Sequence, residues 1–72
     1  MNCNFEDLKD KIGLYYEFDD NNSMGAEYLL VFNRHDEIIG SEFWLPEYTD
    51  KDLKHFLDEI CRNYLQRLSK LK

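Results

Sequence analysis

A chain of 72 residues with a formal net charge of −6 has room for one domain and one hydrophobic core, so residues 1–72 are expected to form a single domain. No basic and apolar leader opens the chain, and no apolar run approaches the ~20 residues of a membrane-spanning helix, which predicts a cytoplasmic protein without membrane contact. Cys3 and Cys61 are too few and too far apart to indicate a disulfide framework.

The charge is distributed unevenly along the chain. Residues 1–50 hold twelve acidic and three basic side chains, whereas residues 51–72 hold three acidic and six basic ones. A mainly acidic surface repels nucleic acid and attracts a cationic surface. The sequence therefore predicts a protein partner with a basic surface and no direct binding of nucleic acid.

The first part of the chain predicts a short helix followed by a strand. Asn4 precedes apolar residues at helical spacing and Gly13 follows them, which favours a helix over about residues 5–12. In residues 14–19, Leu14, Tyr16 and Phe18 recur at every second position, the period of a strand with one buried face. Residues 21–25 predict a hairpin loop, because Asn and Gly tolerate positive φ.

The remaining residues predict two more strands and a long helix. Residues 26–33 are apolar at both odd and even positions, as in a central strand. After a polar turn at 34–37, residues 38–45 form a strand that Pro46 ends. Thr49 is expected to cap a helix whose apolar positions recur every three or four residues. Those positions are Leu53, Phe56, Leu57, Ile60, Cys61, Tyr64, Leu65, Leu68 and Leu71.

These elements together predict an α+β fold in α-β-β-β-α order. Short connections favour a three-stranded antiparallel meander, with a short N-terminal and a long C-terminal helix packed on one face. Aligning the apolar positions of the strands then assigns side chains to faces, because a shift of one residue would turn every side chain over. The face expected to meet the helices holds Leu14, Tyr16, Phe18, Tyr28, Leu30, Phe32, Ile39, Ser41, Phe43 and Leu45.

The opposite face is expected to be an exposed apolar patch with an acidic rim and no Lys or Arg. Exposed apolar patches often mark interfaces, and Trp and Tyr are enriched among binding hot spots. Ile38 lies on this face, and Gly40 beside Val31 predicts a shallow place where another chain approaches. Ordinary scattered surface residues, or the core of a homodimer, are the alternatives. The predicted partner-binding residues are Tyr15, Glu17, Asp19, Glu27, Leu29, Val31, Glu42 and Trp44.

The long helix suggests a second contact surface. About 22 helical residues span roughly 33 Å, whereas a six-residue strand spans about 20 Å, so the helix is expected to outrun the sheet. A dimer or helix contact is then predicted at Tyr64, Leu65, Leu68 and Leu71. The alternative is that the first helix packs there and the last turn frays.

No residue pattern indicates catalysis, a metal or a cofactor. His35 and His55 lie in polar surroundings, no spacing resembles a zinc site, and Ser41 and Cys61 are expected in the core. Carboxylates facing one another across an open sheet would keep ordinary pKa values, which argues against general acid or base catalysis by these groups. There is no glycine-rich phosphate loop either.

The leading functional hypothesis is a non-enzymatic protein-binding module. We expect an acidic inhibitor of the kind that phages and mobile elements use against host defence enzymes, which occupies a basic groove and mimics DNA in charge. The runner-up is a small dimeric chaperone or immunity-like partner of one cognate protein. A structural homodimer without a ligand is the third hypothesis.

Overall fold

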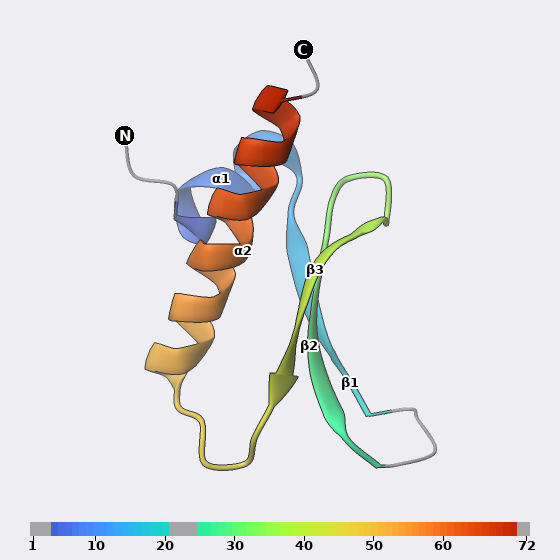
Figure 1. The fold of residues 1–72 in the computed structure, drawn as a ribbon, viewed down its shortest axis with the longest axis vertical. Helices are drawn as coiled ribbons and strands as arrows, with labels where there is room; N and C mark the ends of the chain where they lie inside the picture. The colour runs from blue at the N-terminus through green and yellow to red at the C-terminus, as the bar shows by residue number, and fades with distance from the viewer. Residues whose placement is uncertain (1–3, 21–24, 71–72) are drawn as a thin grey trace.

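The computed structural model describes residues 4–20 and 25–70, which fold as a helix, a three-stranded sheet and a second helix (Figure 1). The elements are α1 (Phe5–Ile12), β1 (Tyr15–Asp19), β2 (Glu27–Phe32), β3 (Ile38–Trp44) and α2 (Asp50–Lys70). The sheet order is β1-β2-β3, and both pairings are antiparallel. The predicted α+β fold and its meander are confirmed. Cys3, positions 21–24 of the predicted hairpin loop, and Leu71 lie outside the described residues.

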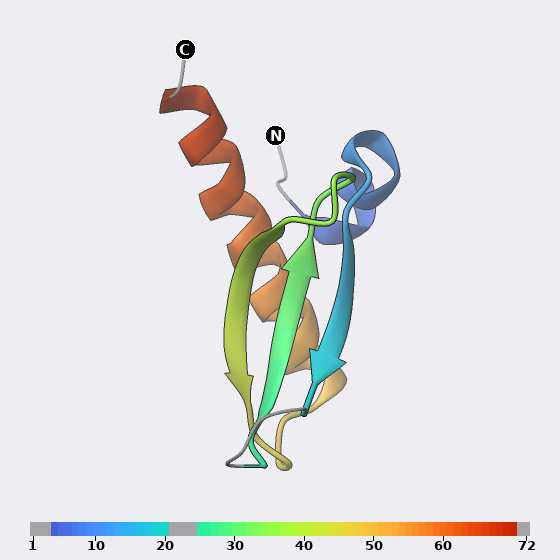
Figure 2. The same ribbon diagram turned by 90° about the vertical axis from the view of Figure 1, so that its right-hand side faces the viewer.

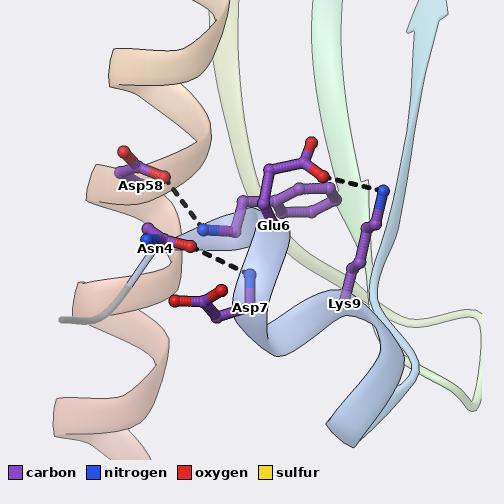
Figure 3. A network of polar contacts seen from close by, with 6 residues as sticks. Asn4, Glu6, Asp7, Lys9 and Asp58 are labelled. Atoms are coloured by element: carbon purple, nitrogen blue, oxygen red, sulfur yellow. Dashed lines mark hydrogen bonds and ion pairs between the residues drawn. The ribbon is translucent and has the colours of Figure 1, made fainter. Parts of the chain in front are cut away.

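The ends of α1 are set by its own sequence. The Asn4 side-chain oxygen accepts a hydrogen bond from the Asp7 backbone N–H at 2.9 Å, which satisfies one of the unpaired N–H groups of the first turn (Figure 3). At the other end Gly13 adopts φ 71°, a left-handed conformation that ends the helix at little cost. An ion pair of 2.9 Å between Glu6 and Lys9 spans one turn of the exposed surface.

Both helices lie on the same side of the sheet, and the other side has no helix over it (Figures 1 and 2). The Phe5 N–H donates to the Asp58 carboxylate at 2.9 Å, so the start of α1 is joined directly to α2 (Figure 3). Thr49 precedes α2, and its backbone N–H donates to the Asp52 carboxylate at 2.8 Å. The far end of α2 extends beyond the sheet, as its length predicts (Figure 1).

The core lies between the sheet and the helices. Leu29 and Val31, on the central strand, have no exposed surface, and Ile60 and Cys61 of α2 are buried against them. The buried apolar set is Phe5, Leu14, Leu29, Val31, Ile39, Leu57, Ile60 and Cys61.

The strand register differs from the predicted one. Tyr16 pairs with Val31, and Val31 pairs with Gly40, so these residues share the helix side with Phe18, Leu29, Glu42 and Trp44. The faces predicted for β1 are correct, whereas those for β2 and most of β3 are inverted. Because β2 is apolar at both parities, hydrophobic alternation could not select its buried side.

A β-bulge and a tight turn change the pairing register between β2 and β3. The register shifts between Val31 and Phe32, so that Phe32 pairs with Ile38 while Ile39 is the extra, buried residue. The turn before it is organised by Asn33, which is buried although polar. The Asn33 side-chain oxygen accepts the backbone N–H groups of His35 and Glu37 at 2.9 and 3.0 Å.

Candidate functional site

The uncovered side of the sheet, which we call the open face, carries side chains from all three strands. Cross-strand pairing arranges it in rows: Tyr15 beside Phe32 and Ile38, Glu17 beside Leu30 and Ser41, and Asp19 beside Tyr28 and Phe43. All of these residues alternate with helix-side residues along the same strands, which is why the helices leave them uncovered.

Aromatic rings on the open face are ordered by contact with one another. Tyr15 stacks on Phe32 with ring centroids 4.9 Å apart, and Tyr28 meets Phe43 edge to face at 5.5 Å. Phe43 nevertheless keeps 47% of its surface exposed and Ile38 keeps 58%. The open face therefore presents apolar groups already held in place, so that a partner would lose little side-chain entropy in ordering them.

The charge of the open face has one sign and one location. Its acidic residues, Glu17 and Asp19, both belong to β1, and the rows contain no Lys, Arg or His. The part formed by β2 and β3 carries only apolar residues, Tyr28 and Ser41. An apolar area with an acidic margin along β1 is complementary to an apolar patch flanked by cations.

Tyr15 connects this margin to the turn between β2 and β3. Its hydroxyl donates to the Asp36 carboxylate at 2.7 Å, and Asp36 is held at φ 62° in the turn. The hydrogen bond to Asp36 is the largest of the effects that raise the pKa of Tyr15 to about 12, because deprotonation would place a phenolate against a carboxylate. The ring of Tyr15 is thus fixed at both its face and its hydroxyl.

We expect the Tyr15 phenol to stay protonated until about pH 12, observed as late titration of its ring carbon resonance in NMR spectra. Since the folded pKa exceeds the ordinary value of about 10, the contribution of this hydrogen bond to stability is complete below pH ~10 and is lost between pH ~10 and ~12. Asp36→Asn should lower the pKa of Tyr15 and keep the turn, because Asn tolerates positive φ. Titration of wild-type Tyr15 near pH 10 would contradict the bond.

The residues predicted to form one partner-binding surface are divided between the two sides of the sheet. Tyr15, Glu17 and Asp19 lie on the open face. Leu29 and Val31 are fully buried in the core, so their predicted exposure is wrong. The remaining predicted residues, Glu27, Glu42 and Trp44, share the helix side, where the Trp44 ring meets Phe56 with centroids 6.2 Å apart.

The open-face residues missed by the sequence prediction are Tyr28, Leu30, Phe32, Ser41 and Phe43, which were expected to face the helices. Gly40 is the signal that could have placed them correctly. A Cβ at Gly40 would lie 2.5 Å from Cγ2 of Ile60, so the glycine marks close approach of α2 rather than of a foreign chain. Gly40 pairs with Val31, and this places Val31 on the helix side and its sequence neighbours on the open face.

The end of α2 is only partly available as a contact surface. Tyr64 packs against the core, Leu65 is half-buried and Leu68 is exposed. The Arg67 guanidinium lies over the Tyr64 ring, 5.9 Å from its centroid, and donates to the Ile39 carbonyl at 2.6 Å. This end of α2 is therefore fastened to β3 by the side chain of Arg67.

Groups with possible chemical reactivity differ in exposure and in their place in the fold. Cys61 is buried as predicted, whereas Ser41 is exposed on the open face and not in the core. His35 and His55 are exposed, and His55 lies 3.3 Å from the Glu59 carboxylate. Across residues 4–20 and 25–70, no group of three or more His, Cys, Asp or Glu side chains could hold a metal ion. Neither helix in the same ranges is long and apolar enough to cross a membrane.

Comparison with known proteins yields no relative. No protein-family model matches the chain, and no curated protein or solved structure is similar enough to indicate common ancestry.

Proposed function

We propose that this chain is a non-enzymatic protein-binding module that docks its open face onto a partner with a basic surface. One observation carries the proposal: exposed, mutually ordered apolar groups on β2 and β3 lie beside an acidic margin on β1, with no cation among them. Such a surface matches an apolar patch bordered by Lys or Arg. The exposed apolar groups would supply most of the affinity, and the acidic margin would orient the partner.

The overall charge supports the same kind of partner. With a net charge of −6 and its acidic residues concentrated in the first fifty positions, the chain attracts cationic surfaces over distances of about a Debye length. We propose that the target is an enzyme with a basic groove, which the chain inhibits by occupying that groove. Many enzymes that act on nucleic acid have such grooves, and phage or mobile-element anti-defence proteins are one setting for an acidic, DNA-mimicking inhibitor.

The test is capture of a target from extracts of the native host by the immobilised chain, followed by an affinity measurement on that target. Phe43→Ala should weaken binding by about tenfold or more, because exposed aromatic side chains are frequent hot spots. Leu68→Ala, on the exposed end of α2, is the matched control and should leave the affinity unchanged. Added salt should lower the association rate.

Other outcomes select the other hypotheses. If Leu68→Ala and not Phe43→Ala removes binding, the end of α2 is the contact surface and the open-face proposal is wrong. A stable dimer in sedimentation experiments that Phe43→Ala dissociates would instead favour a dimeric chaperone or immunity-like protein. Target binding that neither Phe43→Ala nor added salt weakens would contradict the hypothesis of an acidic inhibitor.

A further inference from the structure

We propose further that the outer edge of β1 receives an extended segment of the partner as a fourth strand, with a Lys or Arg of that segment opposite Glu17. This inference rests on the proposed function, because it specifies how the partner reaches the acidic margin of the open face. It adds a backbone contact to the side-chain contacts of the face, and it defines the sequence pattern that the partner segment must carry.

The sheet has two edges, and the β3 edge is obstructed at its start, near Ile39. The sheet order makes β1 and β3 its outer strands. In β3 the bulge at Ile39 breaks the regular backbone spacing that a neighbouring strand needs, and Arg67 already donates to the Ile39 carbonyl at 2.6 Å. Bulges and covering side chains are common means by which proteins prevent strand addition.

The β1 edge has none of these protections. All of its residues pair with β2 in one unbroken register, and the strand Tyr-Tyr-Glu-Phe-Asp contains no Pro, Gly or Lys. Among the described residues, the backbone of Tyr15–Phe18 is paired with β2 and with no other segment. Figure 2 shows β1 as the margin of the sheet, with α1 near the start of the strand, where the Phe5 and Tyr16 ring centroids are 5.8 Å apart. A regular edge strand of this kind is a template for an added strand.

The side chains of β1 determine which strand fits. Glu17 points to the open face, while Tyr16 and Phe18 point to the helix side and keep 38% and 43% of their surface exposed. Directly opposite residues on neighbouring strands share a face and interact, which favours opposite charges and pairs of apolar groups. The incoming strand should therefore present a cation opposite Glu17, between two apolar residues opposite Tyr16 and Phe18.

A second copy of this chain is a poor occupant of the same edge. Antiparallel self-pairing centred on β1 places Glu17 of one copy directly opposite Glu17 of the other, and like charges in that position are unfavourable. The net charge of −6 on each copy adds further repulsion. Glu17 thus disfavours pairing between two β1 edges and favours a basic foreign strand.

The experiment titrates the intact, isotope-labelled protein with the peptide acetyl-Thr-Val-Arg-Val-Thr-amide and follows backbone amides by NMR. We expect saturable shifts at Tyr15–Phe18 and slower hydrogen exchange at every second one of these residues, because only the N–H groups that point away from β2 become newly paired. The peptide with Glu in place of Arg should bind about tenfold more weakly. The Glu17→Arg variant should reverse that preference, a result that a fold defect or unspecific charge attraction would not produce.

Backbone pairing itself is tested with two modified peptides, one methylated on both valine nitrogens and one on the arginine and second threonine nitrogens. Alternate N–H groups of a strand point to opposite sides, so one of the two modifications should abolish binding and the other should be tolerated. Unchanged binding of both methylated peptides, or no saturable binding of the unmodified one, would overturn the fourth-strand proposal. Shifts confined to Tyr28 and Phe43 would also overturn it while leaving the open face as a binding surface. The proposed function is judged separately, by the effect of Phe43→Ala on target capture, so the two proposals fail in distinguishable ways.

Discussion

Leu29→Ala should lower the free energy of unfolding by about 2–5 kcal/mol, measured by urea denaturation, whereas Leu30→Ala on the next residue should cost less than about 1.5 kcal/mol. Leu29 has no exposed surface and lies in the core, so its truncation leaves a cavity. Leu30 is half-buried on the open face, where water can fill the space that its side chain leaves.

The loss in Leu29→Ala is large for a domain of this size, because small domains have a total stability of only about 5 kcal/mol or little more. We therefore expect a substantial unfolded population, and Leu29→Val offers a milder measurement of the same position. A larger loss for Leu30→Ala would mean that the two faces of β2 are exchanged, and equal losses would mean that Leu29 is no more buried than Leu30.

Gly40→Ala should cost about 1–3 kcal/mol of unfolding free energy, since it adds a methyl group where none fits. The new Cβ would lie 2.5 Å from Cγ2 of Ile60 and 3.1 Å from Cγ1. Ile60 is buried and branched at Cβ, so its side chain cannot rotate away easily. Urea or thermal unfolding followed by circular dichroism measures the loss.

The matched control for Gly40→Ala is Ile60→Leu, which moves the branch away from Cβ. The double variant should be more stable than the sum of the two single effects predicts, because Leu removes the methyl group that opposes the new Cβ. Additive effects would show that Gly40 and Ile60 are not in contact. In that case α2 would pack on the sheet in a different position.

The elements of this fold could be predicted because each carries local signals at its ends. Asn4 and Gly13 define α1 through bonds and backbone angles within a few residues, and α2 starts directly after Thr49. The meander follows from short connections, which bring consecutive strands together. These features depend on residues that are close together in the sequence, so a sequence pattern can reveal them.

The β2 part and most of the β3 part of the open face were predicted wrongly, because their location depends on contacts between distant residues. The odd and even positions of β2 are both apolar. The packing of α2 against the sheet therefore determines that Leu29, and not Leu30, is buried. The single-residue bulge at Ile39 then alters the phase of β3. Likewise, the bond from Phe5 to Asp58 joins residues 53 positions apart, and no local pattern indicates it.

The alternation of the strands has a consequence for how this protein can change over generations. Core residues such as Leu29 and open-face residues such as Leu30 and Phe43 share a backbone but no packing environment. Substitutions on the open face therefore leave the buried set intact, and selection can act on affinity for a partner with little penalty in folding. A lineage under pressure from a changing target could replace this surface repeatedly while it inherits the same scaffold.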